Sequence, residues 1–363
     1  MYVENFNISL IKLKKEAIKL LIRIINTPSI SKEEYKVSVI IENYLRNYGF
    51  IVNRKLNNIW TENINFSKNR MLRTILLNSH HDTVKPGKNW KNNPFKSKIK
   101  GEKIIGLGSN DAGGSIVSMI TAFIYLSKLS ELPYKLILSI TAEEEISGNS
   151  GIISILPELG KLDLGIVGEP TKMKAAIAEK GLLILDCIAK GKTGHSAQND
   201  GINAIYIAIK DIEFLKNFCF DKTSKLLGKT TLNVTQICGG FQHNVIPDIC
   251  TFVIDIRTNE LYDNKELINI IKKKINSKIN PRSYNFNSYF IDPNHPIVLK
   301  AKSIGIKTYG SPTHSDQCLM PFSTIKIGVG DSSRSHTSNE YILFKEIIDG
   351  IDIYINLLKD FCF

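Results

Sequence analysis

Apolar residues along the chain follow two kinds of pattern. A helical period runs over 7–25 and ends at Pro28, and the Ser-Lys-Glu-Glu run at 31–34 has the form of a capping box that opens a second helix toward Tyr48. Short continuous apolar runs, typical of buried strands, occur at 74–78, 136–142, 164–168 and 324–329. Helical sequence separates the first three runs. This alternation indicates an α/β fold with a mostly parallel sheet and helices on both faces.

The middle of the chain shows a different order of elements. Strand patterns at 181–189, 231–236, 250–257 and, more weakly, 283–290 enclose helical patterns at 204–218 and 265–279. The resulting β-α-β-β-α-β order is the ferredoxin-like arrangement, which forms a small α+β domain by itself. We therefore predict a domain inserted at 180–290, between a first part of the α/β domain at 1–179 and a second part at 291–363.

The composition agrees with two folded domains. The chain has 363 residues, of which 43% are apolar. This length suffices for about two domains that each bury a core, and the composition excludes a disordered or fibrous protein.

The sequence also predicts a cytoplasmic protein. Charged residues interrupt the apolar positions near the N-terminus, so no secretion signal is predicted. The most apolar helical stretch, at 116–126, is shorter than the roughly 20 residues that cross a bilayer. The six cysteines form no C-x-x-C pair, which indicates reduced thiols rather than disulfides or a zinc ribbon.

The net charge of +12, from 47 Lys and Arg against 35 Asp and Glu, raises nucleic-acid binding as an alternative function. The basic residues are spread along the chain, and no zinc-finger spacing or RNP-like aromatic strand occurs. We therefore expect a small-molecule substrate, and neither nucleic acid nor a membrane as a partner.

Acidic and histidine residues follow the predicted strands of the α/β domain. In chain order these are His80-His81-Asp82, Glu143-Glu144-Glu145, Glu169 and His336. Ligands of open α/β sheets bind beyond the carboxyl ends of the strands, so these side chains can converge on one crevice. Each group alone is more typical of a core histidine or a solvated acidic face, but their repetition at four strand ends favours a site. Converging carboxylates repel one another unless a cation lies among them.

Oxygen and imidazole donors in this mixture favour zinc, cobalt or manganese and indicate a metal hydrolase. Asp111 lies in a glycine-rich loop at 106–114 that leads into the apolar helix, where the backbone can approach a site closely. Glycines before a helix can also bind phosphate. The spacing here fits neither the dinucleotide motif nor the P-loop, and the Asp111 carboxylate would repel a phosphate.

The two-residue period of an extended chain gives the two adjacent histidines different orientations. Residues 80 and 82 point to the same side, so the Asp82 carboxylate can accept the second ring N–H of His80 and fix its tautomer, as metal-binding histidines require. His81 then faces away, in a structural role.

With these residues the chain resembles the M20 family of metallopeptidases and deacylases, and within it the acetylornithine deacetylase type that also acts on succinylated intermediates. The resemblance runs from about Leu20 to the C-terminus. Its motifs are Ser79-His-His-Asp-Thr-Val84, Gly106-Leu-Gly-Ser-Asn-Asp111, Thr141-Ala-Glu-Glu-Glu145, Gly168-Glu-Pro-Thr171, Gly194-His-Ser-Ala197, Asn244-Val-Ile-Pro-Asp248, Asp255-Ile-Arg257 and His336-Thr-Ser-Asn-Glu340. Each motif is weak alone, but their order and spacing together are specific.

The resemblance implies a site with two divalent metal ions. His80 and Glu169 would hold one ion, Glu145 and His336 the other, and Asp111 would bridge them. Three carboxylate ligands and two divalent ions sum to about +1, a balance that makes the cluster electrostatically sound. Zinc is the first expectation, with cobalt or manganese as alternatives.

The resemblance also implies roles for residues around the metal ions. Asp82 would support a metal ligand, and Glu144 would be the general base that passes a proton from water to the leaving amine. His195, from the lid of a partner subunit, would stabilise the oxyanion, which implies a homodimer through the inserted lid and dimerisation domain. Asn244 and Arg257 would bind the backbone and carboxylate of the substrate.

The main hypothesis is a two-metal amide hydrolase that removes the acyl group of an N-acyl amino acid, namely N-acetyl- or N-succinyl-ornithine or citrulline in arginine synthesis. Alternatives within the hydrolases are a dipeptidase, an aminopeptidase or a succinyl-diaminopimelate desuccinylase. Alternatives of another class are a basic nucleic-acid-binding protein and a metal-binding protein without catalytic activity.

Overall fold

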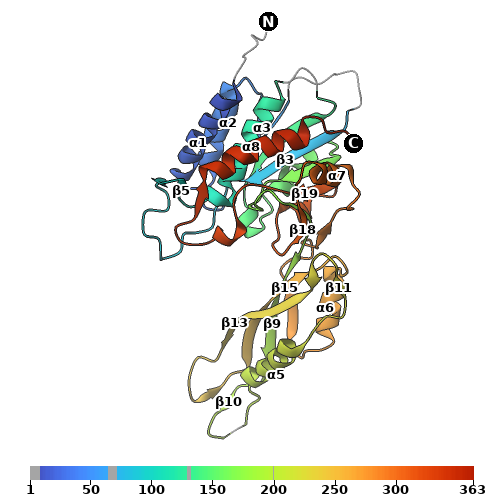
Figure 1. The fold of residues 1–363 in the computed structure, drawn as a ribbon. Helices are drawn as coiled ribbons and strands as arrows, with labels where there is room; N and C mark the ends of the chain where they lie inside the picture. Colours follow the sequence, from blue (N-terminus) through green and yellow to red (C-terminus); the bar gives the residue numbers. More distant parts are fainter. Residues whose placement is uncertain (1–8, 64–71, 129–131, 199) are drawn as a thin grey trace. The chain divides into compact units, whose positions relative to one another are not determined.

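The computed structural model describes residues 9–63, 72–128, 132–198 and 200–363. These residues divide into two compact units (Figure 1). The second unit comprises Ala178–Phe290 and Gly310–His314, and the other described residues form the first unit.

A mixed β-sheet forms the centre of the first unit. Seven of its strands, in spatial order, are β1 (Val52–Lys55), β2 (Asn58–Glu62), β6 (Lys135–Thr141), β3 (Thr74–His80), β7 (Leu164–Val167), β19 (Thr324–Lys326) and β8 (Ala175–Glu179). The short strands β17 (Tyr289–Phe290) and β18 (Thr308–Ser311) both pair with β8. The pairs formed by β6, β3, β7 and β19 are parallel, whereas β1, β2 and β8 add antiparallel strands at the edges. The α/β fold class is confirmed, with the parallel pairing confined to the four central strands.

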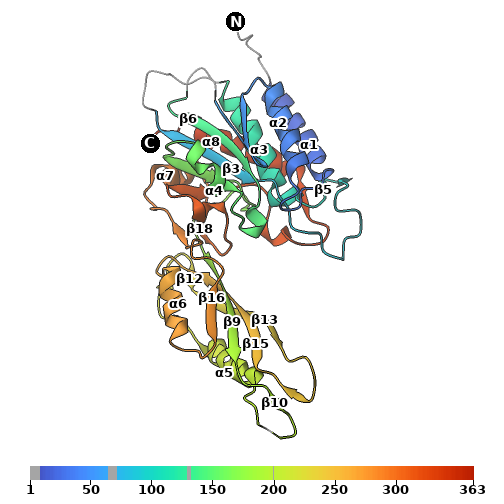
Figure 2. The ribbon, with the colours of Figure 1, turned by 180° about the vertical axis from the view of Figure 1, so that it is seen from behind.

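Helices cover both faces of this sheet. They are α1 (Leu10–Ile25), α2 (Tyr35–Asn47), α3 (Gly114–Leu126), α4 (Ile152–Ile155), α7 (Pro296–Ser303) and α8 (Phe344–Leu358). Helix α8 lies in front of the sheet in Figure 1, and α4 lies in front of it in the reverse view of Figure 2. Every residue of β3 is buried, which explains the apolar run at its centre. No helix among the described residues is long and apolar enough to span a membrane.

A small sheet of β4 (Lys98–Lys100), β5 (Lys103–Ile105) and β20 (Tyr341–Leu343) adjoins the glycine-rich loop. Strand β5 leads into that loop, and β20 follows the segment that carries His336. The antiparallel pairing of β5 with β20 therefore brings together two segments that lie far apart in the sequence.

The predicted capping box before α2 is wrong. Helix α2 begins at Tyr35, and Glu34, at the capping position, makes no capping hydrogen bond with its side chain. The Ser31 hydroxyl instead donates to Asp82 Oδ2 at 2.7 Å, and the Glu34 carboxylate accepts from Asn57 Nδ2 at 2.7 Å. Tertiary partners of these side chains replace the local cap. The helix predicted from residue 7 begins at Leu10, and residues 7 and 8 lie outside the described residues.

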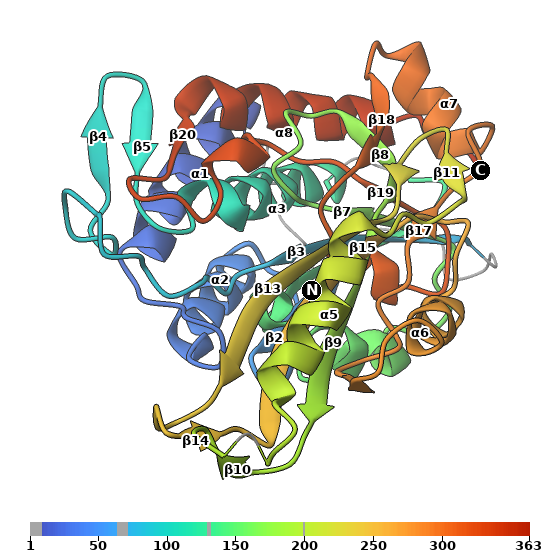
Figure 3. The ribbon, with the colours of Figure 1, turned by 90° about the horizontal axis from the view of Figure 1, so that it is seen from below.

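The second unit contains a four-stranded antiparallel sheet in the order β13 (Thr231–Gly239), β15 (Ile249–Thr258), β9 (Gly181–Lys190) and β16 (Lys278–Pro281). Two helices, α5 (Ala204–Asn217) and α6 (Asn264–Lys272), belong to the same unit. Helix α5 packs across β9, β13 and β15, as Figure 3 shows. Alternate residues of β9 are buried against these helices, as expected for a sheet with one covered face. Short pairs are formed by β10 (Gly194–His195) with β14 (Val245–Ile246) and by β11 (Thr223–Ser224) with β12 (Gly228–Lys229).

Two predictions for the end of this unit are wrong. The helix predicted over 265–279 ends at Lys272, because the buried Asp211 carboxylate accepts the backbone N–H groups of Asn276 (3.0 Å) and Ser277 (2.8 Å) and holds them in a loop. The fourth strand of the sheet is β16, which follows that loop. The region predicted as the fourth strand, 283–290, contains only the short β17 (Tyr289–Phe290), which pairs with the end of β8.

Candidate metal centre

Three parallel strands end at the same edge of the first unit's sheet. In the register of the sheet His80 lies opposite Thr141, and Asn78, two residues before His80, lies opposite Val167. Glu144 and Glu169 follow Thr141 and Val167 within three residues. The parallel register thus brings the predicted histidine and both glutamates to one edge.

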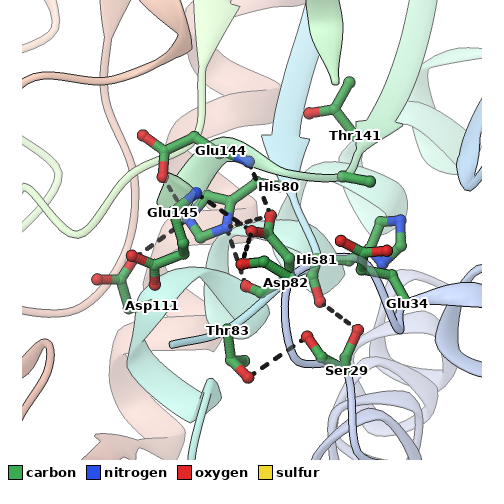
Figure 4. A network of polar contacts seen from close by, with 12 residues as sticks. Ser29, Glu34, His80, His81, Asp82, Thr83, Asp111, Thr141, Glu144 and Glu145 are labelled. Atoms are coloured by element: carbon green, nitrogen blue, oxygen red, sulfur yellow. Dashed lines mark hydrogen bonds and ion pairs between the residues drawn. The ribbon is translucent and has the colours of Figure 1, made fainter. Parts of the chain in front are cut away.

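His80 lies among carboxylates and is almost completely buried, with 1% of its side chain exposed (Figure 4). Its Nε2 atom is 3.2 Å from Asp111 Oδ1, 3.6 Å from Glu169 Oε1 and 3.9 Å from Glu144 Oε2. Its Nδ1 atom is 3.1 Å from the backbone oxygen of Asp82 and 3.4 Å from the Oδ1 atom of the same residue. These acceptors favour a proton on Nδ1, which leaves Nε2 free to bind a metal ion.

Asp111 lies between the two predicted metal positions. One of its carboxylate oxygens faces His80, and the other is 3.6 Å from His336 Nε2. His336 Nε2 is also 2.8 Å from Glu145 Oε2. The structure therefore brings together all five residues predicted as metal ligands, with Glu169 near His80, Glu145 near His336, and Asp111 close to both histidines.

Asp82 organises the turn that carries the two glutamates. Its Oδ1 and Oδ2 atoms each accept a hydrogen bond at 3.1 Å, from the backbone N–H groups of Glu144 and Glu145 respectively. Glu143, just before them, has a positive φ of 58°, a conformation that few residues other than glycine adopt. Asp82 lies against His80, as predicted for its carboxylate, but its backbone oxygen is the nearer acceptor for the ring nitrogen. Its hold on this turn is a second role that the sequence did not reveal.

His81 has a structural position, as predicted. It is 3% exposed, and its Nε2 atom is 3.0 Å from the backbone oxygen of Asn57. Burial lowers the pKa of His81 to about 4, so the ring is neutral at physiological pH.

Burial and mutual repulsion raise the pKa values of the three glutamates. Burial raises the pKa of Glu169 to about 8, where the nearby Asp111 adds to the effect and His80 opposes it. The pKa of Glu144 also lies well above its usual range, because of burial and the charges of Glu169 and Glu145. Burial and Asp111 likewise raise the pKa of Glu145.

The pKa values of the two histidines and of Asp111 shift in the direction that favours their charged forms. Burial lowers the pKa of His80, but the carboxylates of Glu169 and Glu144 outweigh it and raise the pKa well above 6.5. The hydrogen bond with Glu145 raises the pKa of His336 to about 9 despite partial burial. Burial raises the pKa of Asp111, but its hydrogen bond with His80 outweighs burial, and the net shift is downward.

The residues present fit divalent metal ions. Two sets of three donors, His80 with Asp111 and Glu145, and His80 with Glu144 and Glu169, each place their donor atoms within 4.8 Å of one another. The raised pKa values of the glutamates and of both histidines mean that, without metal, bound protons offset the negative charge of the cluster. A divalent cation at the same place would offset that charge instead. Imidazole nitrogen and carboxylate oxygen form the donor set of catalytic zinc.

The remaining predicted site residues lie in the second unit. His195 on β10 pairs with Val245 on β14, and the backbone oxygen of Asn244 accepts a hydrogen bond from Ser196 N at 3.1 Å. Two motifs that are about 50 residues apart are therefore neighbours in space. His195 Nδ1 accepts from Ala197 N at 3.1 Å, so a neutral His195 carries its proton on Nε2 and can donate it.

Arg257 lies on β15 with 37% of its side chain exposed. Its Nε and Nη2 atoms donate to the Asp255 carboxylate at 2.8 and 3.0 Å. This pair leaves donors of the planar guanidinium available for a further carboxylate.

Two buried acids near the metal positions were not predicted as site residues. Asp316 accepts from Asn78 Nδ2 at 2.9 Å and from Thr141 Oγ1 at 3.0 Å, and so links the ends of β3 and β6. Glu340 accepts from the backbone of the Asp111 loop. The position of Glu340 in the last motif of the resemblance could have identified it as a site residue. No motif in the irregular sequence around Asp316 identifies that residue.

Comparison with known proteins identifies the family to which this chain belongs. A family model described as a peptidase dimerisation domain matches residues 177–282. The chain is 30% identical to the succinyl-diaminopimelate desuccinylase of Wigglesworthia glossinidia brevipalpis, over 93% of this chain and 96% of that protein. The chain belongs to the M20 family of metallopeptidases and deacylases.

Other M20 proteins show the range of similarity. The chain is 28% identical to the acetylornithine deacetylase of Buchnera aphidicola subsp. Schizaphis graminum, over 95% of this chain and 98% of that protein. The crystal structure of a dinuclear metal-binding M20 peptidase from Bacillus subtilis matches with a TM-score of 0.73 and 16% identity, over 95% of this chain and 97% of that one. At that identity the match shows the M20 fold.

Metal binding to this M20 protein should release protons. Without metal, Glu169 with a pKa of about 8 and His336 with a pKa of about 9 are mainly protonated at about pH 7, whereas metal ligands must be deprotonated. Affinity should therefore rise with pH through this range. Calorimetric titration of zinc in buffers of different ionisation enthalpy measures the release, and a binding enthalpy that does not depend on the buffer would contradict it.

Proposed function

We propose that this M20 protein is a two-metal amide hydrolase that removes the acyl group from an N-acyl amino acid. One observation carries the proposal: Asp111 lies between His80 and His336, each accompanied by its own glutamate, with Glu144 beside them. The two most fully matched relatives described above are both deacylases of N-acylated amino acids by name. The substrate we propose is N-acetyl- or N-succinyl-ornithine or citrulline.

His80 and Glu169 would hold one divalent ion, Glu145 and His336 the other, and Asp111 would bridge them. Two such ions supply a water molecule of lowered pKa and polarise the amide carbonyl. Zinc suits this donor set best, and cobalt or manganese can replace it.

Glu144 acts as general base and then as general acid. Its Oε2 atom is 3.9 Å from His80 Nε2, and its side chain is 12% exposed. The carboxylate takes a proton from the attacking water, whose oxygen forms a bond to the carbonyl carbon. As the C–N bond breaks, Glu144 passes that proton to the leaving amine.

His195 donates to the oxyanion from the lid of a partner subunit. Its backbone and Nδ1 contacts leave the Nε2–H free to donate, as an oxyanion donor must. Asn244, next to it, would bind the substrate backbone, and Arg257 the substrate carboxylate. These assignments rest on the likeness of the motifs to those of the family.

A homodimer through the second unit completes this proposal. Helix α5 exposes Tyr206 (71%) and Ile209 (49%), and β13, at the edge of the sheet, exposes Ile237 (54%). Exposed apolar side chains beside an unpaired strand edge are typical of an interface between copies of a chain. The matched dimerisation-domain model covers this surface.

Replacing Glu144 by Gln should reduce kcat by about a hundredfold to ten-thousandfold, the usual contribution of a general base. Metal content should stay that of the wild type, because Glu144 is not a proposed ligand. The matched control is Glu143→Gln, since the Glu143 carboxylate accepts a hydrogen bond from Ser150 N nearby. Turnover and elemental analysis of both variants measure this, and wild-type turnover of Glu144→Gln with full metal content would refute the mechanism.

The substrate class is tested by amine release from N-acetylornithine, N-succinylornithine, N-acetylcitrulline, N-succinyl-diaminopimelate and simple dipeptides. We expect the highest kcat/KM on an ornithine or citrulline derivative. The second candidate function, desuccinylation of diaminopimelate, is favoured by the 30% identity to a desuccinylase. A preference for N-succinyl-diaminopimelate would establish that alternative.

Salt-sensitive retention of DNA or RNA without amine release would support a nucleic-acid-binding protein. Bound metal without turnover would support a metal-binding protein that has no catalytic activity.

Charges placed on the apolar face of α5 should separate the dimer. We expect Tyr206→Asp with Ile209→Asp to sediment as a monomer and to lose turnover while keeping its metal, because His195 would no longer reach a neighbouring site. Asn269→Asp, on the exposed face of α6, should remain a dimer. Analytical ultracentrifugation with activity assays distinguishes these cases, and a fully active monomer would contradict the role of a partner's His195.

A further inference from the structure

The Glu340 carboxylate lies beneath the loop that carries Asp111. It accepts hydrogen bonds from the backbone N–H groups of Gly108 (3.2 Å), Asn110 (2.7 Å) and Asp111 (3.0 Å). Glu340 is 1% exposed, so water does not compete for these contacts. One buried carboxylate thus satisfies three backbone donors of an irregular loop, in which Gly108 has a positive φ of 74°.

The same segment carries His336, so the contacts of Glu340 connect two metal-binding segments. The backbone oxygen of Glu340 also accepts from Gly106 N at 3.0 Å. From the other side, Asn110 Nδ2 donates to the backbone oxygen of Asp331 at 3.0 Å, and Asn110 Oδ1 accepts from Asp331 N at 2.9 Å. The Asp111 loop and the 331–340 segment are therefore tied together at both ends.

We propose that Glu340 is a positioning residue that holds the Asp111 loop against the His336 segment, so that the ligands of both metal ions are in place before metal binds. This inference rests on the proposed metal centre. Burying a carboxylate beside Asp111 opposes folding unless hydrogen bonds offset it, and the three backbone donors provide that offset. Glu340 itself does not reach the reacting atoms and acts only through the backbone of its neighbours.

Two variants of Glu340 remove these contacts to different degrees. Glu340→Gln keeps one oxygen, which can still accept from Asn110 and Asp111, but turns an amide toward the Gly108 N–H. Glu340→Ala removes all three acceptors. The matched control is Glu346→Gln. Glu346 also accepts a backbone N–H, from Leu343 at 2.9 Å, and pairs at 2.8 Å with Arg334 of the 331–340 segment, but none of its hydrogen bonds among the described residues reaches the Asp111 loop.

The experiment is a zinc titration of the full-length protein after chelator treatment. We expect the affinity to fall in the order wild type, Glu340→Gln, Glu340→Ala, by tenfold or more for the last, which is the usual effect of removing a group that orients a metal ligand. Glu346→Gln should bind as the wild type does. With saturating cobalt(II), the visible absorption of Glu340→Gln should differ from that of wild type and Glu346→Gln, which a loss of stability alone would not cause.

If Glu340→Ala fails to fold, the affinity and cobalt spectrum of Glu340→Gln decide the question. Wild-type affinity and an unchanged spectrum in the folded variants, or an equal loss in Glu346→Gln, would overturn the positioning role. A wild-type protein that binds fewer than two equivalents would contradict the proposed function and, with it, this inference. A wild type with two equivalents and unaltered Glu340 variants would leave the proposed function intact.

Discussion

Repulsion among buried carboxylates constrains the edge of the sheet where the predicted metal ligands meet. Asp111, Glu144 and Glu169 each approach His80 Nε2 within 4 Å, and Glu145 lies on the other side of Asp111 beside His336. Water is largely excluded from this cluster, so charges of one sign cannot be screened there. The parallel strands bring the acids together, and either protonation of the acids or positive charge among them must offset the repulsion. Divalent cations supply such charge and also provide a use for it in catalysis.

Two further carboxylates hold the backbone around this cluster. Asp82 accepts the N–H groups of the turn that carries Glu144 and Glu145, and Glu340 accepts those of the loop that carries Asp111. Both segments contain residues with positive φ and leave several backbone donors without partners in regular structure. The fold thus uses acidic side chains for two purposes, as candidate metal ligands and as anchors of the loops that present them.

The features that follow from periodicity could be predicted from the sequence. Burial on both faces made the strands that end near His80, Thr141 and Val167 continuously apolar, and the residues after them identified the site edge. The approach of Asp111 to His336 depends on tertiary pairing of β5 with β20, which no local pattern encodes. The strand ends and the glycine-rich loop indicate that both residues can reach the crevice, but only the likeness of the motifs to a family predicts that Asp111 lies between two ions. Ser31 shows where a local sequence pattern fails to predict the structure. Its sequence context is that of a helix cap, yet its hydroxyl bonds Asp82, because a tertiary partner replaces the local one. In the same way, Asp211 holds residues 276 and 277 out of the helix that periodicity predicts.

The proposed site requires Asp111 to lie between two metal ions. Anomalous diffraction from crystals of the purified protein, recorded on both sides of the zinc absorption edge, tests this. We expect two anomalous peaks about 3.5 to 4 Å apart, one beside His80 and Glu169 and one beside His336 and Glu145, each in contact with one oxygen of Asp111. A single peak, or peaks that do not contact Asp111, would contradict the claim.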